Sequence, residues 1–281
     1  MAVRIVVDST ADIPRERAAR LGIAVVPETV LFGDETFLDG VDLDGPAFYQ
    51  KLATSRILPT TSAPSPGLLE ETYRQVISAG ASGILSLHLA STFSATYSAA
   101  QGAAAVVRQE SGVPITVLDT GTVSAGFGLP AELVADEAQQ GMLLADLQAR
   151  VESLCRRMHL FAVLETLEFL QRGGRIGRAR ALLGTLLQMK PLLGVREGEV
   201  VPLENIRTRT QAYERLGQRV AQLGELEALA VVASAPAASE SLQAVVRQFW
   251  AGPIATYTLG PVVGTHAGPG AAGVAAISRA G

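Results

Sequence analysis

Hydroxyl side chains gather in residues 87–100, LHLASTFSATYSAA. Six of these fourteen residues carry a hydroxyl and none carries a charge. The apolar runs GILSL just before this stretch and AAAVV shortly after it indicate buried surroundings. A hydroxyl in such a place can bind an anionic group by donating a hydrogen bond, or it can act as a nucleophile beside a base.

Three other segments rich in Ser and Thr lie where strands are expected to end or helices to begin. They are DST at 8–10, PTTSAPSPG at 59–67 and DTGT at 119–122, with Ser124 close behind. In an open α/β sheet, ligands bind beyond the carboxyl ends of the strands, and helix N-termini there attract anions. Any one of these hydroxyls is explained more simply as a helix N-cap. Four such segments together favour a polar rim that binds an anion.

His266 lies in VVGTHAGPGAAG (262–273), where flanking glycines predict a loop. A loop position favours a functional histidine, although a structural role stays open; His88 and His159 are expected to be structural. The G-x-G-x-x-G spacing at 268–273 does not predict nucleotide binding, because no βαβ unit or acidic residue follows it in the printed sequence. A G-x-x-x-x-G-K-[ST] loop for ATP is also missing from the sequence.

Four arginines surround a Gly-Gly break in FLQRGGRIGRAR (169–180). The segment is a solvated basic face, an anion clamp formed by Arg175, or a basic patch that meets an acidic partner. The net charge of −4 argues against a nucleic-acid partner. His, Cys and carboxylate groups do not recur at metal-ligand spacing, so no metal is expected.

A serine hydrolase is the main enzymatic alternative. Ser94 or Ser62 would be the nucleophile and His266 the base. The sequence contains no G-x-S-x-G elbow, and it marks no particular Asp as the third member of a triad. An autonomous kinase is a third hypothesis, and the missing nucleotide loop argues against it.

The elements that must position these residues alternate between strand and helix in the first half, which is typical of a parallel α/β sheet. Turn residues add a hairpin around Gly33-Asp34. We therefore predict an α/β domain with a parallel sheet over residues 1–157. The expected strands are 4–9, 23–28, 83–89 and 115–119, and the expected helices are 45–55, 66–79, 94–109, 126–140 and 144–157.

The second half has an α+β pattern, so we place a domain boundary near residue 157 and a second domain over 158–281. A hairpin is predicted around Glu197-Gly198, and the final segment is rich in Gly and Pro. The other expected strands are 160–165, 229–234 and 254–259, and the expected helices are 166–172, about 177–189, 208–223 and 237–249.

Composition agrees with two domains and sets their environment. The 281 residues are 48% hydrophobic and 18% charged, which is enough apolar material for large cores and for an apolar cavity. The single Cys155 excludes an internal disulfide, and MAVRIVVDS predicts a strand rather than a signal peptide, so we expect a cytoplasmic protein. The uncharged stretches 78–107 and 248–278 are interrupted by Gly, Ser, Thr and Pro and predict no membrane insertion.

The sequence resembles the DegV family, the fatty-acid-binding subunits of bacterial fatty acid kinases, nearly from end to end. It departs from the family at Ala63, where TSQPS has Gln, and at Phe93, Ala95 and Ser98, where LSGTYQSA has Leu, Gly and Gln. The matching motifs are VDSTADIP (7–14), TSAPSPG (61–67), STFSATYSAA (91–100), LDTGTVSAGFG (118–128), LEFLQRGGRIGRA (167–179), QMKPLL (188–193) and THAGPGAAG (265–273).

The resemblance implies a Rossmann-like amino-terminal domain, an α/β carboxyl-terminal domain and an apolar tunnel for a long-chain fatty acid such as palmitate, stearate or oleate. It implies a carrier without catalysis or cofactor, whose bound acid a separate ATP-dependent kinase converts to an acyl phosphate. The implied carboxylate-binding residues are Thr61, Ser62, Ser94, His266 and Arg175. We add Ser9, Thr96, Thr122 and Thr265 as a secondary polar rim, and Arg172, Arg178 and Arg180 as the candidate contact with the kinase.

Overall fold

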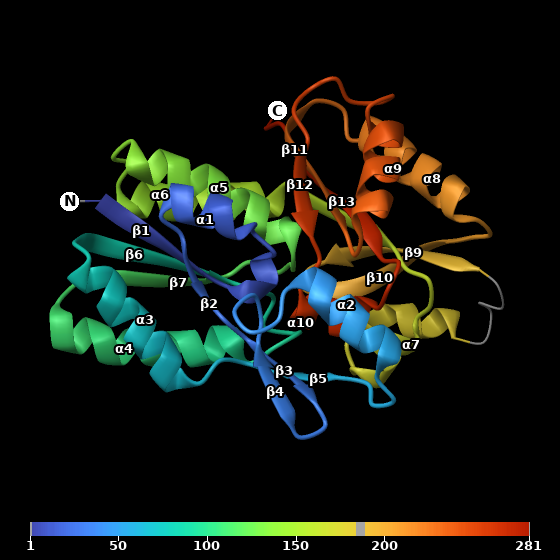
Figure 1. The fold of residues 1–281 in the computed structure, drawn as a ribbon. Coiled ribbons are helices and arrows are strands. Elements are labelled where there is room, and N and C mark those ends of the chain that lie inside the picture. The colour runs from blue at the N-terminus through green and yellow to red at the C-terminus, as the bar shows by residue number, and fades with distance from the viewer. Residues whose placement is uncertain (1, 184–188, 281) are drawn as a thin grey trace.

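The computed structural model describes residues 2–183 and 189–280. Figure 1 shows a first sheet with its helices, coloured blue to green, beside a second sheet coloured yellow to red. The first sheet is parallel and has the strand order β2-β1-β6-β7, as predicted for the first half. Its strands are β1 (Ala2–Asp8), β2 (Ala24–Val26), β6 (Ala81–His88) and β7 (Ile115–Asp119).

Alternation along these strands divides their side chains between two apolar layers. Val6 and Ile84 pack beneath α3 (Pro66–Ser78) and α4 (Thr96–Ser111). Val7 and Leu87 face the opposite layer. The helices of that layer are α1 (Arg15–Leu21), α5 (Ala125–Gln139) and α6 (Leu144–Arg156).

A small antiparallel sheet follows β2 in the chain. The predicted hairpin is confirmed: β3 (Thr29–Phe32) pairs with β4 (Glu35–Leu38) across a turn in which Gly33 has φ of 63°. The strand β5 (Thr60–Ser62) pairs with the other edge of β3, where we had expected a loop. The helix α2 (Gly45–Thr54) covers this sheet, and the Asp44 side chain caps it by accepting from the Ala47 N–H at 2.8 Å.

The second sheet is mixed and has the order β10-β9-β8-β13-β11-β12. Only the pair β11–β12 is parallel among the strands described. The helices α8 (Arg209–Gln222) and α9 (Pro236–Val246) cover one face. The strands are β8 (Met158–Val163), β9 (Lys190–Arg196), β10 (Glu199–Ile206), β11 (Leu226–Ala233), β12 (Ala255–Thr258) and β13 (Ala272–Ser278).

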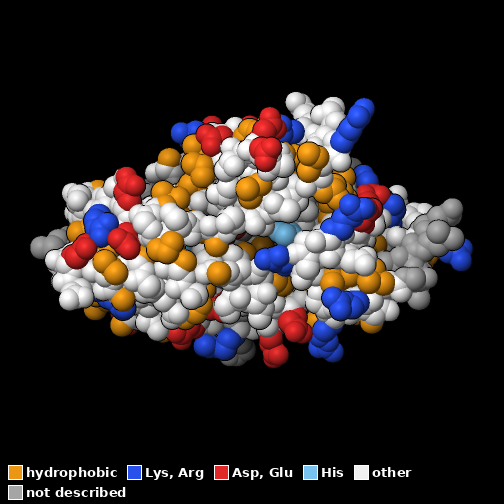
Figure 2. Space-filling model, turned by 90° about the horizontal axis from the view of Figure 1, so that it is seen from below, with side chains coloured by type: hydrophobic (Ala, Val, Ile, Leu, Met, Phe, Trp, Pro, Cys, Tyr) orange, Lys and Arg blue, Asp and Glu red, His pale blue; other side chains and the backbone are white. Residues whose placement is uncertain are grey.

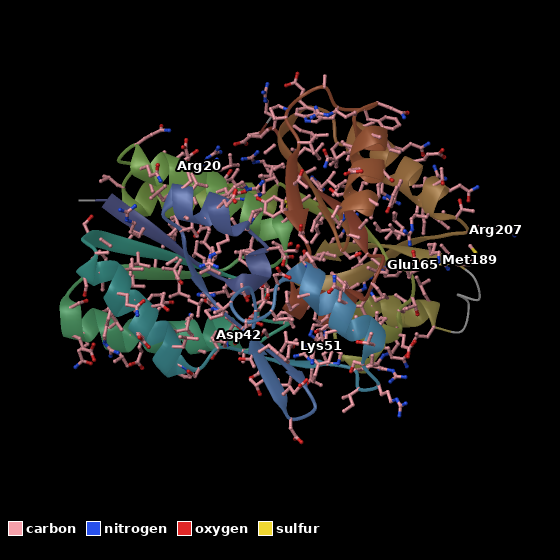
Figure 3. All side chains as sticks on the ribbon, in the orientation of Figure 1. Arg20, Asp42, Lys51, Glu165, Met189 and Arg207 are labelled. Carbon is pink, nitrogen blue, oxygen red and sulfur yellow. The ribbon has the colours of Figure 1, made fainter. Side chains whose placement is uncertain are left out.

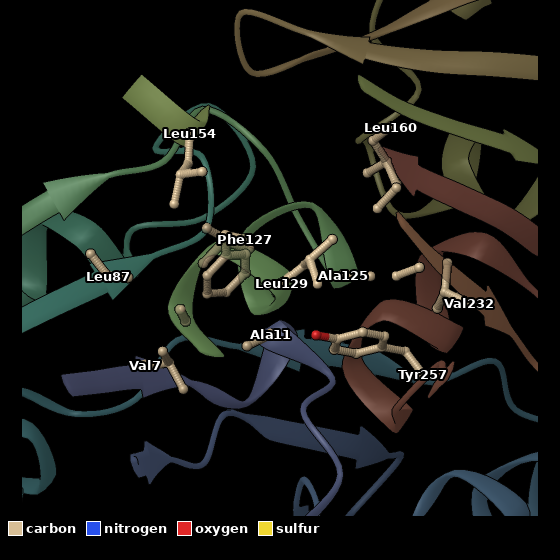
Figure 4. Packing of buried hydrophobic residues seen from close by; sticks show 14 of the residues in the cluster. Val7, Ala11, Leu87, Ala125, Phe127, Leu129, Leu154, Leu160, Val232 and Tyr257 are labelled. Atoms are coloured by element: carbon tan, nitrogen blue, oxygen red, sulfur yellow. The ribbon is translucent and has the colours of Figure 1, made fainter. Parts of the chain in front are cut away.

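The largest apolar cluster joins the two sheets through α5. Figure 4 shows Phe127 of α5 between Val7 and Leu87 of the first sheet and Leu160 and Val232 of the second. Helix α5 lies so close to its neighbours that a β-carbon on Gly128 would be 2.3 Å from the Ala11 carbonyl oxygen. The small residues of AGFG therefore let one helix pack against both sheets.

Two predictions for the second half need correction. The helix expected at about 177–189 is a 3₁₀ helix, η2 (Gly177–Leu182), because Gly177 has φ of 52° and a contact with Val200 leaves no room for a side chain; 184–188 lie outside the described residues. The Gly/Pro-rich ending is not a loop. It forms α10 (Pro261–Ala267) and the buried strand β13, since Gly268 and Gly270 confine the positive φ angles to one short turn.

Candidate ligand-binding site

A cavity of about 1050 Å³, its open end included, lies between the two sheets. Most of its lining is apolar, and Val232, Leu193 and Val200 are each at most 7% exposed. Thr61, Ser94, Arg175 and His266 also line it, and these side chains are half-buried or exposed. The cavity is thus a mainly apolar space with polar side chains near its opening, which suits an amphipathic ligand.

Two segments far apart in the sequence meet at Thr61 and His266. Thr61 Oγ1 lies 3.0 Å from His266 Nε2. Alternation along β5 turns Thr61 toward the cavity, and α10 carries His266 there. Burial and the nearby Arg175 lower the pKa of His266 to about 4, so its imidazole is neutral at pH 7.

Ser94 is connected to a buried carboxyl group through Thr96. Ser94 Oγ lies 2.8 Å from Thr96 Oγ1, and Thr96 Oγ1 donates to Glu28 Oε1 at 2.5 Å. Glu28 lines the cavity and is 2% exposed. Burial raises the pKa of Glu28, and the neighbouring Asp8 raises it further.

Arg175 joins the two halves of the chain at the cavity. Its Nε donates to the Phe93 carbonyl oxygen at 3.0 Å, and its Nη1 donates to the Gly173 carbonyl oxygen at 2.6 Å. The guanidinium is exposed and lines the cavity. It places a fixed positive charge near the two hydroxyls, in reach of an anionic head group.

Buried carboxyl groups support the elements around the cavity. Asp12 accepts from the Gly260 N–H at 2.8 Å, and Asp39 accepts from Ser9 Oγ at 2.9 Å and from the Val262 N–H. The two carboxyl groups therefore satisfy N–H groups at the start of α10, the helix that carries His266. Burial raises the pKa of Asp12 and raises that of Asp39 to about 7.

The structure does not bring Ser62 to the cavity. Its side chain is exposed, and its hydroxyl donates to the Ala63 carbonyl oxygen at 3.3 Å. The physical reason is strand alternation: Thr61 faces inward in β5, so Thr60 and Ser62 face outward. This alternation could not be anticipated while 59–67 was interpreted as a loop.

The four residues of the expected secondary rim support the site from behind rather than lining the cavity. Ser9 donates to Asp39, and Thr96 donates to Glu28. Thr265 donates to the Pro261 carbonyl oxygen within α10, and Thr122 Oγ1 is buried beside Gly126. Thr10, Glu28 and Ser124 line the cavity instead. Thr10 and Ser124 belong to the hydroxyl-rich segments that predicted the polar rim, whereas Glu28 was not predicted.

Of the four arginines in residues 172–180, only Arg175 lines the cavity. Arg172 forms an ion pair with Glu168 at 2.8 Å, and the Arg178 and Arg180 side chains are exposed. Figure 2 shows basic side chains beside hydrophobic ones on the face seen from below, with a histidine near its middle.

A separate ionic group joins β9 to α8, where Glu165 pairs with Lys190 and Arg209. Figure 3 places Glu165 near Met189 and Arg207.

The geometry does not pair His266 with Ser94 or Ser62, as the hydrolase alternative requires. His266 Nε2 bonds Thr61, while Ser94 bonds Thr96 and Ser62 bonds a backbone oxygen. His266 Nδ1 has no hydrogen-bond partner in the part of the chain that the structure describes. A catalytic triad requires a carboxylate or similar group at that nitrogen to orient the base.

Comparison with known proteins assigns the chain to a family. The family described as "Uncharacterised protein, DegV family" matches residues 2–279. The chain belongs to the DegV family. A DegV domain-containing protein of Streptomyces coelicolor is 36% identical over 282 residues, which cover 99% of each chain.

Solved structures of DegV proteins have the same fold. One solved structure, described as "Fatty Acid Binding of a DegV family Protein from Thermus thermophilus", matches with a TM-score of 0.88 and 32% identity, covering 99% of this chain and 100% of the other. "Crystal Structure of DegV, a fatty acid binding protein from Bacillus subtilis" matches with a TM-score of 0.88 and 29% identity, at the same coverage. The resemblance drawn from the motifs is therefore confirmed.

Two properties of the described residues bear on other classes of ligand. None of the helices in residues 2–183 and 189–280 is long and apolar enough to cross a bilayer. Within the same residues, His, Cys, Asp and Glu side chains form no group of three or more that could hold a metal ion. The buried carboxyl groups are hydrogen-bonded to protein groups instead.

Proposed function

We propose that this chain binds a long-chain fatty acid, such as palmitate, stearate or oleate, and presents its carboxylate to a separate protein. The observation that carries the proposal is the apolar cavity between the sheets, with Thr61 and Ser94 near its opening. Each methylene buried there contributes roughly 0.8 kcal/mol, so the tail supplies most of the affinity. The fatty acid binding named for the DegV proteins of T. thermophilus and B. subtilis supports the proposal.

The head group is held by uncharged donors and one cation. Neutral His266 donates from Nε2 to Thr61, which leaves the Thr61 hydroxyl hydrogen free for the carboxylate. Placing the proton on Nε2 also avoids an unpartnered buried N–H at Nδ1. Ser94 meets the carboxylate from the other side, and Arg175 supplies positive charge when the head becomes an acyl phosphate.

The chemical step belongs to a partner in this proposal. An ATP-dependent fatty acid kinase transfers the phosphoryl group, and this chain contributes the sequestered acid. Arg172, Arg178 and Arg180 are the proposed contact, because they are exposed and flank Arg175 in the sequence. The division into units at 1–157 and 158–281 is part of the same proposal, since each unit supplies one wall of the cavity.

Native mass spectrometry of the protein purified from a bacterial host tests the proposal. We expect a complex that releases an ion of fatty-acid mass on denaturation. Protein that arrives empty, cannot be loaded with oleate and hydrolyses a chromogenic acyl ester would overturn the proposal in favour of the hydrolase. Consumption of ATP by the isolated chain would instead indicate an autonomous kinase.

A further inference from the structure

Glu28 reaches the cavity in two ways, directly and through two hydroxyl groups. It lines the cavity, and it is also the end of the chain Glu28–Thr96–Ser94, whose two links measure 2.5 and 2.8 Å. Ser94 Oγ accepts in addition from the Thr96 N–H at 3.3 Å. Glu28 and Thr96 are 2% and 0% exposed, so bulk water does not interrupt this chain.

The number of hydrogens limits which way these bonds run. A hydroxyl has one hydrogen to donate. When Glu28 is ionised, Thr96 donates to it, and the Ser94–Thr96 bond can then form only if Ser94 donates. Ser94 then has no hydrogen left, and it turns a lone pair toward the cavity. A fatty acid carboxylate meets repulsion there.

When Glu28 carries a proton, the direction of donation is reversed in both hydrogen bonds between Glu28 and Ser94. Glu28 then donates to Thr96, Thr96 donates to Ser94, and the Ser94 hydrogen is free to point into the cavity. The charged groups that face Glu28 are the carboxyl groups of Asp8 and Asp39 and the guanidinium of Arg175. The two carboxyl groups and burial raise the pKa of Glu28, whereas Arg175 and the Thr96 hydrogen bond lower it.

We propose that Glu28 is a positioning residue whose protonated form makes Ser94 a donor to the fatty acid carboxylate. The proposal rests on the proposed function, because it concerns the same head group. It deepens that function by assigning the direction of each hydrogen bond behind Ser94. It also makes retention of the acid depend on a proton that neither the ligand nor Ser94 carries.

Equilibrium binding of the fluorescent fatty acid cis-parinaric acid, measured from about pH 6 to about pH 9, tests this, because buried glutamates can titrate as high as about 8 to 9. We expect the wild-type affinity to fall about tenfold or more as pH rises, the loss of one hydrogen bond to a charged group. Glu28→Gln keeps the size and hydrogen bonding of the side chain but does not titrate, so its affinity should stay level. The ionisation of the ligand itself changes with pH in the same way in both experiments, so it does not explain a difference between the two proteins.

Thr96→Val separates the hydrogen-bond chain from simple charge repulsion. Valine has the shape of threonine without the hydroxyl, so Ser94 can donate to the ligand at every pH. We expect most of the decline in affinity to disappear in this variant, although Glu28 is still present. A full decline in Thr96→Val would overturn the relay, because Glu28 would then act through its charge alone.

A ligand control covers the case in which a variant does not fold. Displacement of cis-parinaric acid from the wild type by oleyl alcohol should show no loss at high pH, since a hydroxyl head can donate to the Ser94 lone pair. An equal loss for acid and alcohol would contradict the proposal. Failure of the wild type to bind cis-parinaric acid at any pH would instead overturn the proposed function.

Discussion

Gly173 lies against the imidazole of His266, and a β-carbon there would be 2.2 Å from Nδ1. The backbone of Gly173 has φ of −73°, which any residue adopts, so the glycine is required only for space. The first glycine of the RGGR segment thus holds the ring that contacts Thr61.

Gly173→Ala should therefore weaken fatty acid binding by displacing His266 from Thr61. We expect the affinity to fall about tenfold, the cost of one hydrogen bond to the head group. Gly102→Ala is the matched control, because Gly102 lies in α4 with nothing within 4 Å of an added β-carbon. That control should bind normally and gain about 0.5 to 1 kcal/mol of stability. Equal binding by the two variants would contradict the prediction.

Ser94→Ala should reduce retention of the fatty acid far more than it reduces folding stability. The change removes a donor to the carboxylate, and Thr96 keeps its hydrogen bond to Glu28. We expect the melting temperature of the ligand-free protein to fall by only a few degrees, about 1 kcal/mol or less. Affinity and acyl phosphate formation by the partner kinase are the measurements, and normal values for both would remove Ser94 from the site.

Asp39→Asn should change how stability depends on pH. The folded pKa of Asp39 is raised to about 7, so its contribution to stability is present at low pH and is lost as pH rises toward 7. The variant lacks this loss and still accepts a hydrogen bond from Ser9 through its amide oxygen. Between about pH 5 and about pH 8, the free energy of unfolding of the variant should rise relative to that of the wild type by an amount on the order of 3 kcal/mol.

Chemical denaturation of both proteins at several pH values measures this difference. Titratable groups whose pKa does not depend on Asp39, such as His266, cancel in the comparison. A free-energy difference that stays constant across the range would show that Asp39 is ionised in the folded protein at all these pH values.

Charge reversal at Arg178 or Arg180 should weaken coupling to the proposed kinase partner while fatty acid binding stays intact. Both side chains are exposed, and the cavity lining includes neither of them. Arg20→Glu is the control, because it makes the same charge change on α1, in the other half of the molecule (Figure 3). Phosphorylation rate and lipid content are measured together. Loss of both in an Arg178→Glu variant would indicate misfolding rather than a contact.

Local pattern predicted most elements because their periodicity agrees with their final environment. β7 was predicted with its observed bounds, and the hairpins at Gly33 and Glu197-Gly198 followed from turn residues. The pattern failed at β5, where TTS has no apolar alternation, and at β13, whose small residues resemble a glycine-rich tail. Both strands exist because they pair with distant partners, and a local window does not contain those partners.

The site was predicted in part for the same reason. Hydroxyls on several loops indicated an anion site, and Thr61, Ser94, His266 and Arg175 do line one cavity. Glu28 was missed because a lone acidic residue usually faces solvent. Its only signal was its place between the apolar segments VVP and TVLF. Its burial depends on Thr96, which is 68 residues away.

The position of β13 sets the order in which the molecule can be completed. This strand is made after every other strand of the second sheet, yet it lies between β8 and β11 in the interior of that sheet. While the chain is being synthesised, the edges of β8 and β11 that later pair with β13 therefore lack that partner. The wall that the second sheet gives the cavity is therefore complete only after residues 272–278 have inserted between β8 and β11.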